Sequence, residues 1–222
     1  MKPLRWIVRL AMGPNWAVLE QAQAQPEAPL AFPLEVALGS KSLTMREVAA
    51  GDDAAILKFA QALPPHDLLF LRRDITNPDQ VAALIHAAEE GLARTLLVFE
   101  GDDLVGYASV TSEGLTWTRH VRELRVLVAL SMRGMHLGRL LTEQAFAIAR
   151  ADGASKMVAQ MTVDQDAAVG AFRRLGFVPE ARLRNHVIDR DGKLHDLQIM
   201  SLDVDKFQVM LDLALAPEPM QI

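Results

Sequence analysis

The chain has 222 residues, half of them apolar, and a formal net charge of -5. This length provides for one domain with a sizeable core. The absence of cysteine excludes disulfide bonds, a thiolate zinc site and a cysteine nucleophile. The mild negative charge argues against a nucleic-acid-binding protein, and no apolar run approaches the roughly 18 residues that a membrane-spanning helix needs.

The first 40 residues differ in composition from the rest of the chain. Residues 1–10 are basic and partly apolar, but Arg5 and Arg9 interrupt the apolar run that a signal peptide requires. We interpret them as an amphipathic appendage of a cytoplasmic protein. Residues 21–33 are rich in Ala, Gln and Pro, which favours an extended linker. The expected organisation is an appendage and linker over 1–40, one domain over 41–205, and a tail over 206–222 with a short helix at 206–215.

Hydrophobic periodicity and turn residues predict strands and helices in succession from residue 42 onward. Strands are predicted over residues 42–48, 95–100, 104–111, 120–130, 156–162, 177–188 and 194–204, and helices over 53–63, 77–90, 137–150 and 166–175. Asn77 as cap and Pro78 at the first helical position mark one helix start. This order predicts an α/β (α+β) fold, with a mixed central sheet of six to seven strands and helices on both faces.

Residues 124–141 combine a strand, a basic glycine-containing loop and the start of a helix. The free N–H groups and the dipole of a helix N-terminus attract anions. Gly134 and Gly138 permit close approach of a ligand to the backbone, and Arg133 and Arg139 add positive charge. The segment therefore suits a diphosphate. The structural alternative is that the glycines only let the helix pack closely on the strand.

The loop Arg133-Gly134-Met135-His136-Leu137-Gly138 resembles the Arg/Gln-x-x-Gly-x-Gly/Ala loop in motif A of the GNAT superfamily of N-acetyltransferases. Residues 165–177 resemble the second signature of that superfamily, Asn-x-x-Ala-x-x-x-Tyr-x-x-x-Gly-Phe. Both signatures occur at the spacing and in the order of the superfamily, and the resemblance covers residues 42–204. A nucleotide-binding P-loop is excluded, because no Gly-Lys-Ser/Thr follows the glycines.

The resemblance implies a GNAT-like acyltransferase fold, with acetyl-CoA or another short acyl-CoA as cosubstrate and no metal. It places the pantetheine arm where two central strands separate, which maps to Leu127, Val128 and Ala129. The diphosphate maps to the backbone of Arg133, Gly134, Met135, His136, Leu137, Gly138 and Arg139. Gln165 and Phe172, from the second signature, complete the implied cofactor-binding set.

Three residues depart from the superfamily pattern. His136 stands where glycine is usual, Gln165 replaces Asn, and Phe172 replaces a Tyr that protonates the leaving thiolate in many relatives. The loss of this Tyr is tolerable, because a thiol with a pKa of about 8.5 leaves readily as the thiolate.

Glu123 is the candidate general base that takes a proton from the acceptor amine. Strand alternation places it on the face opposite Leu124, and the resemblance implies that carboxylates on this strand often serve as the base, directly or through water. The alternative is a structural charge paired with Arg122 or Arg125.

The acceptor region is expected between the early helices, about residues 53–90, and the last hairpin. Apolar residues 68–71, together with Arg72 and Arg73, fit either a small acid or an apolar acceptor. His195 and Asp196 on the hairpin either bind the acceptor or are simply polar residues at a strand end.

The resulting prediction is an acyl-CoA-dependent N-acetyltransferase that acts on a primary amine by direct attack in a ternary complex. The expected partner is a small-molecule or protein amine, such as an amino acid, a polyamine, an aminated drug or a protein. Neither a nucleic acid nor a membrane is expected, and a homodimer is allowed for. The alternative is a catalytically degenerate acyl-CoA-binding sensor or interaction protein, which His136 and Phe172 favour, while Glu123, Gly134 and Gly138 oppose it.

Overall fold

The computed structural model describes residues 32–207, except residues 70, 72, 113, 115 and 190. The predicted appendage, nearly all of the predicted linker and most of the predicted tail helix lie outside these residues, as do Phe70 and Arg72 of the expected acceptor region. Within the described ranges, no helix is long and apolar enough to cross a membrane.

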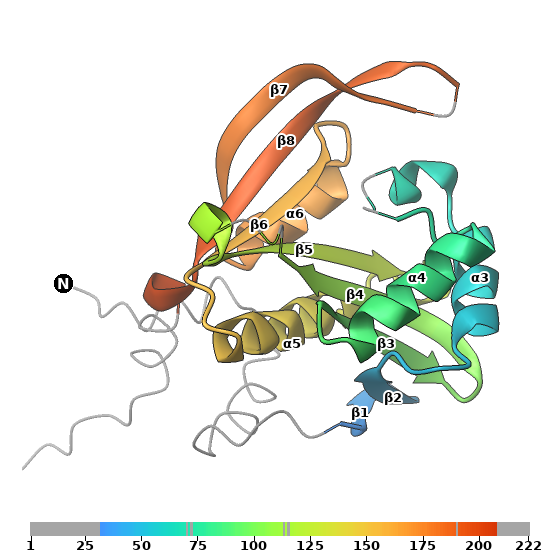
Figure 1. Cartoon of the computed structure of the whole chain (residues 1–222). Coiled ribbons are helices and arrows are strands. Elements are labelled where there is room, and N and C mark those ends of the chain that lie inside the picture. Colours follow the sequence, from blue (N-terminus) through green and yellow to red (C-terminus); the bar gives the residue numbers. More distant parts are fainter. Residues whose placement is uncertain are drawn as a thin grey trace, which may run out of the picture.

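One sheet of eight strands, in the order β1-β2-β3-β4-β5-β6-β8-β7, forms the centre of the molecule (Figure 1). The strands are β1 (Leu34–Leu38), β2 (Lys41–Glu47), β3 (Ala93–Glu100), β4 (Asp103–Thr111), β5 (Val121–Val128), β6 (Lys156–Thr162), β7 (Val178–Ile188) and β8 (Leu194–Asp203). All neighbouring strands are antiparallel except the parallel pair β5 and β6. The predicted mixed sheet is therefore confirmed, with one strand more than expected.

The additional strand is β1. It pairs with β2 from Leu34↔Met45 to Leu38↔Lys41, so the sheet begins before residue 40, where the sequence analysis placed the end of the linker. Its residues alternate between half-buried and exposed, but five residues are too few for this pattern to stand out beside the preceding proline-rich segment. Gly39, with a φ of +63°, forms the tight turn into β2.

Two pairs of helices cover the two faces of the sheet (Figure 1). On one face lie α3 (Asp53–Gln61) and α4 (Pro78–Glu89), and on the other α5 (Leu137–Ala151) and α6 (Asp166–Arg174). The predicted start of α4 is confirmed, because the Asn77 side chain accepts the N–H groups of Asp79 at 2.9 Å and Gln80 at 3.3 Å. Three short 3-10 helices lie in the connections, η2 (Pro65–Leu68), η3 (Thr116–Thr118) and η4 (Leu130–Met132).

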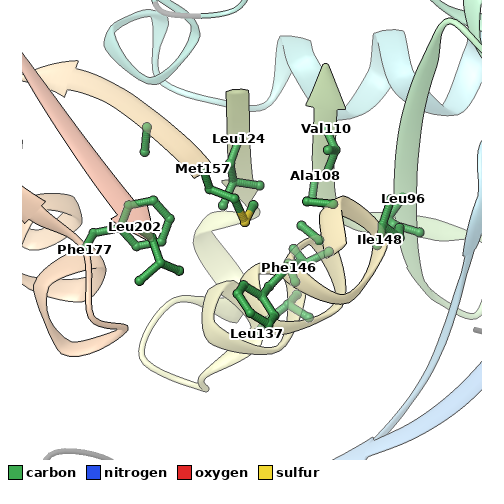
Figure 2. Close-up of a cluster of buried hydrophobic side chains, with 14 of the residues drawn as sticks. Leu96, Ala108, Val110, Leu124, Leu137, Phe146, Ile148, Met157, Phe177 and Leu202 are labelled. Carbon is green, nitrogen blue, oxygen red and sulfur yellow. The ribbon is translucent and has the colours of Figure 1, made fainter. Parts of the chain in front are cut away.

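An apolar cluster on each face joins the helices to the sheet. Figure 2 shows the cluster on the α5 side, where Leu137, Phe146 and Ile148 of the helix meet Leu124 and Ala108 of the strands. The second cluster joins α3 and α4 to the opposite face. Because burial of apolar side chains is the main stabilising term in folding, these two layers fix the helices against the sheet.

Gly106 of β4 determines how closely α5 approaches the sheet. A Cβ atom at this position would lie 3.1 Å from Leu137 Cδ2 and from Leu141 Cδ1, and 3.2 Å from Val98 Cβ. These distances are shorter than ordinary van der Waals contact, so a larger residue would displace the helix. The first turn of α5 is thereby held directly over β4.

The parallel strands β5 and β6 separate toward their C-terminal ends. Their last paired residues are Leu124 and Ala159, although β5 continues to Val128 and β6 to Thr162. From Arg125 onward, β5 therefore has a ladder partner only on its β4 side. This is the strand separation that the sequence analysis expected in the middle of the sheet.

Candidate functional site

The free edge of β5 offers backbone groups on its β6 side. Ala129 donates its N–H to the carbonyl oxygen of Val105 at 2.9 Å, on the β4 side. Because successive residues of a strand direct their N–H and C=O groups to opposite sides, Val126 and Val128 direct theirs toward β6, beyond the last ladder pair. Val128 belongs to the predicted pantetheine-binding set, and Val126, which the set does not include, has the same orientation. Leu127 packs into the cluster on the α3/α4 side.

The loop that follows β5 passes through η4 and enters α5 at Leu137. Met132 and Leu137 are fully buried and anchor the two ends of the loop in the core, while Met135 packs against the same cluster. Gly134 has a φ of +77° and His136 a φ of +67°. Glycine adopts this left-handed conformation freely, whereas it strains a histidine. The backbone geometry therefore explains why glycine is usual at the position of His136.

Several N–H groups of this loop and of the first helical turn are available to a ligand. Arg133 and Met135 donate theirs to the carbonyl oxygens of Leu130 and Met132, each at 3.3 Å. Within the described part of the chain, no backbone carbonyl accepts the N–H groups of Gly134, His136 or residues 137–139. Together with the dipole of the 15-residue helix α5, these groups form a site suited to an anion.

The two basic side chains of the loop have carboxylate partners. Arg133 is ion-paired with Asp67 of η2. Arg139 donates through Nε to Glu143 Oε1 at 2.7 Å, one helical turn further on. The attraction of the loop for an anion thus depends more on its backbone than the sequence analysis assumed.

Gly138 has no packing requirement for glycine. A Cβ atom there would meet only Val128 Cγ2, at 3.5 Å, which is an ordinary contact, and its φ lies outside the left-handed region. Gly138 therefore differs from Gly106, where α5 can pack closely on the sheet only because the residue has no side chain. The packing explanation for Gly138 therefore loses its support, and its role in the approach of a ligand stays a prediction.

Gln165 and Phe172 of the second signature lie at the start and in the last turns of α6. Gln165 closes the turn after β6, with its Oε1 accepting the Thr162 N–H at 3.3 Å. The ring of Phe172 is edge-on to Phe177, with centroids 5.0 Å apart, and packs against the same core cluster as Val128. Both residues thus lie on the α5/α6 side of the sheet.

Glu123 is 7% exposed and ion-paired with Arg125. Arg125 in turn donates to the carbonyl oxygen of Gln160 at 3.1 Å, and so bridges β5 and β6 where they separate. The predicted alternation along β5 is confirmed, because Leu124 belongs to the cluster under α5 and Leu127 to the opposite one. The structural pairing with Arg125 is present, and a role for Glu123 as the base stays a prediction.

A cavity of about 370 Å³ lies on the α3/α4 face. Its floor is formed by Thr95, Tyr107, Ser109 and Arg125, and α4 and Arg73 contribute to its walls. Burial raises the pKa of Tyr107, while its hydrogen bonds with Ser109 and Thr95 and the charges of Arg73 and Arg125 act in the opposite direction. Arg73 and the lining residues of α4 fall within the expected acceptor region of residues 53–90, whereas Thr95, Tyr107, Ser109 and Arg125 lie outside it.

His195 and Asp196 do not act as a pair. His195 is held by Asp189 at 2.7 Å, whereas Asp196 accepts the Asn185 N–H at 2.9 Å and is paired with Arg182. His195 instead faces His66 of η2, with ring centroids 5.6 Å apart. Among the described residues, no group of three or more His, Asp or Glu side chains is arranged to hold a metal ion.

Comparison with known protein families identifies the family of this chain. The model of the acetyltransferase (GNAT) family matches residues 63–177, which is half of the chain. The chain therefore belongs to the GNAT family of acetyltransferases. No curated protein shows a significant match to the sequence.

Solved structures share the fold. A putative acetyltransferase, yncA, from Salmonella typhimurium, solved with acetyl-CoA, is 26% identical, with a TM-score of 0.63 over 73% of this chain and 94% of that one. A GNAT-family acetyltransferase from Streptococcus pneumoniae is 23% identical, with a TM-score of 0.63 over 72% and 99% of the two chains. Spermidine N-acetyltransferase from Vibrio cholerae, in complex with CoA and spermine, is 19% identical, with a TM-score of 0.63 over 75% and 98%.

Proposed function

We propose that the chain transfers an acetyl or other short acyl group from acyl-CoA to a primary amine, without a covalent acyl-enzyme. The separation of β5 from β6 beyond Leu124 and Ala159 carries this proposal. It exposes a strand edge that leads directly into the glycine loop and the N-terminus of α5. A pantetheine arm, which contains two amides, can pair with such an edge as an added strand does, while the diphosphate meets the loop N–H groups.

The bound acyl-CoA would present its thioester near the point where the strands part. The amine nitrogen attacks the thioester carbon, the C–N bond forms, the C–S bond breaks, and CoA leaves as the thiolate. The nitrogen loses one proton, which Glu123 accepts directly or through a water molecule. Phe172 has no hydroxyl to protonate the thiolate, and a leaving group with a pKa of about 8.5 departs without that help.

A catalytically inactive acyl-CoA-binding protein is the second candidate. The strained His136 and the commitment of Glu123 to Arg125 favour it. Gly134 and Gly138, which were expected to oppose it, do not distinguish the two candidates, since both need the donor loop. Turnover therefore decides between them.

The test combines turnover with binding. Purified protein is incubated with acetyl-CoA and a panel of amines, and free thiol is followed with a chromogenic disulfide, to which the cysteine-free chain contributes no background. Amine-dependent thiol release, together with the acetylated amine in a mass spectrum, is the expected result. Stabilisation by CoA in thermal unfolding without release by any amine would favour the inactive binder. Neither stabilisation nor release at millimolar CoA would reject both candidates.

A further inference from the structure

We infer that the acceptor is a small amine that also carries a carboxylate, bound in the cavity on the α3/α4 face with its carboxylate at Arg73. This inference rests on the proposed function and specifies its substrate class. The cavity, at about 370 Å³, is near the lower end of the size range of small-molecule sites, which suits a molecule the size of an amino acid.

The cavity adjoins the position proposed for the acyl group. Arg125, part of its floor, is the first residue of β5 beyond the last pair with β6, and it reaches across to Gln160. Ser109 lies opposite Arg125 in the β4–β5 ladder, and Tyr107 lies opposite Leu127. An amine at the floor of the cavity is therefore next to the strand edge that the thioester would occupy.

The charges around the cavity select for an anion. Among the described residues, its lining contains two arginines and no aspartate or glutamate. Arg125 is paired with Glu123, which leaves Arg73 as the lining guanidinium with no hydrogen bond or ion pair among the described residues. A guanidinium binds a carboxylate with two parallel hydrogen bonds, and this geometry suits a partly buried site.

The hydroxyl groups and apolar side chains complete the fit. Thr95, Tyr107 and Ser109 are 2%, 2% and 7% exposed, so the floor offers buried hydrogen-bonding groups. Leu71, Leu84 and Leu92 line the remainder and accommodate an apolar part of the acceptor.

The same lining disfavours a polyamine. A molecule with several ammonium groups would find no aspartate or glutamate among the described residues of the lining to compensate its charge.

The test uses L-amino acids, each paired with its carboxamide, and spermidine as a cation without a carboxylate. For the best amino acid, kcat/KM should exceed that of its carboxamide by about 100-fold, in line with the loss of hydrogen bonds to a charged partner. Arg73→Gln should remove this preference. It should lower kcat/KM for the amino acid and change kcat/KM for the carboxamide by less than threefold. Arg119→Gln, an exposed arginine outside the cavity lining, is the matched control.

Better turnover of carboxamides or spermidine than of acids would overturn the inference, and carboxamide preference would indicate a peptide amine instead. Equal losses for acid and carboxamide in Arg73→Gln would also overturn it. If no amine is acetylated, thermal unfolding with N-acetyl-L-amino acids in the presence of CoA tests the site instead. Stabilisation that Arg73→Gln abolishes would support the proposed site. The absence of any stabilisation would reject it. Binding of CoA alone, measured in parallel, tests the proposed function separately.

Discussion

Asp67 is ion-paired with Arg133, 66 residues away in the sequence, and so connects η2 to the loop after β5. Its neighbour His66 contacts the other side of the strand separation, with Nε2 at 3.2 Å from Thr162 Oγ1 at the end of β6. Two adjacent residues of η2 thus contact the loop that follows β5 and the end of β6. The segment between α3 and α4 therefore helps to shape the proposed donor site as well as the proposed acceptor cavity.

Release of Arg133 should strengthen CoA binding. Asp67→Asn removes a negative charge close to the diphosphate site, which at several ångströms in a high-dielectric medium corresponds to about a two- to fivefold lower Kd at low ionic strength. Arg133→Gln should have the opposite effect. Isothermal titration at low and high salt is the measurement, and both differences should disappear at high salt because screening removes them. Weaker binding in Asp67→Asn would show that the pair instead holds the loop in its binding conformation.

Removal of the side chain at position 136 should stabilise the protein. His136 occupies a left-handed conformation at a φ of +67°, so His136→Gly should raise the free energy of unfolding by about 0.5–1 kcal/mol after the entropic cost of glycine. CoA affinity should be retained, because the loop N–H groups remain. Urea unfolding measures the change. His136→Ala retains Cβ and should show no such gain, and an equal gain in both variants would trace the effect to the imidazole rather than to the backbone.

Substitutions at Gly138 should separate stability from binding. The new Cβ of Gly138→Ala makes an ordinary contact with Val128, and alanine is the better helix former, so the free energy of unfolding should be unchanged or higher by up to about 1 kcal/mol. Since the superfamily loop has either Gly or Ala at this position, Gly138→Ala should also retain CoA binding. Gly138→Val should weaken CoA binding by tenfold or more, because its larger side chain occupies space that the ligand approaches. Titration and urea unfolding on one preparation give both values. Normal CoA affinity in Gly138→Val would remove Gly138 from the site.

Gly106→Ala is the matched contrast. Its Cβ would lie 3.1 Å from side-chain atoms of Leu137 and Leu141, so the free energy of unfolding should fall by about 1–3 kcal/mol, as for other overpacked cores. The same urea titration measures it. Unchanged stability would mean that α5 shifts freely over β4.

Glu123→Gln should lower the rate of acetyl transfer by roughly 10²–10⁴-fold if the carboxylate is the base. CoA affinity should change little, because the expected cofactor contacts are mostly backbone. The difference in rate between the variant and the wild type should shrink as the pH rises toward the pKa of the amine, where neutral amine is abundant. A pH–rate profile of both proteins on one amine is the measurement, with Glu180→Gln on β7 as control. Equal rates at neutral pH would restrict Glu123 to holding Arg125.

Asp52 should make the fold sensitive to acid. Burial raises its pKa, but bonds from Arg46 at 2.6 and 2.7 Å and from the Ala49 N–H outweigh this, and the net pKa is lowered. A lowered folded-state pKa contributes stability above the unfolded value of about 3.9, and this stability is lost as the pH falls below it through the folded value. Asp52→Asn should lower the free energy of unfolding by about 1–3 kcal/mol at pH 7 and by less at pH 3.

Urea unfolding at both pH values measures this dependence. Asp103→Asn, which removes an exposed partner of Lys58, should have little effect at either pH. If Asp52→Asn lowered the free energy of unfolding equally at pH 7 and pH 3, the loss would come from packing rather than from the charged hydrogen bonds.

The sequence by itself determined the features that arise within one element or between neighbouring residues. The cap at Asn77, the limits of β6, the placement of Glu123 opposite Leu124 and the strand–loop–helix at residues 124–141 all follow from local hydrogen bonding and from the periods of strand and helix. The two GNAT signatures are also local patterns, so they could be recognised from the sequence alone.

Only the tertiary structure decided the relationships between elements. The end of the β5–β6 ladder at Leu124 and Ala159, the pairing of Arg133 with Asp67, and the meeting of Arg73, Thr95 and Tyr107 in one cavity depend on strand register and on how helices pack against the sheet. Register and packing result from many weak contacts between distant segments, and no periodicity within one segment specifies them. The candidate donor loop and the part of the cavity around Arg73 could therefore be predicted from the sequence, whereas the strand residues that meet Arg73 in the cavity could not.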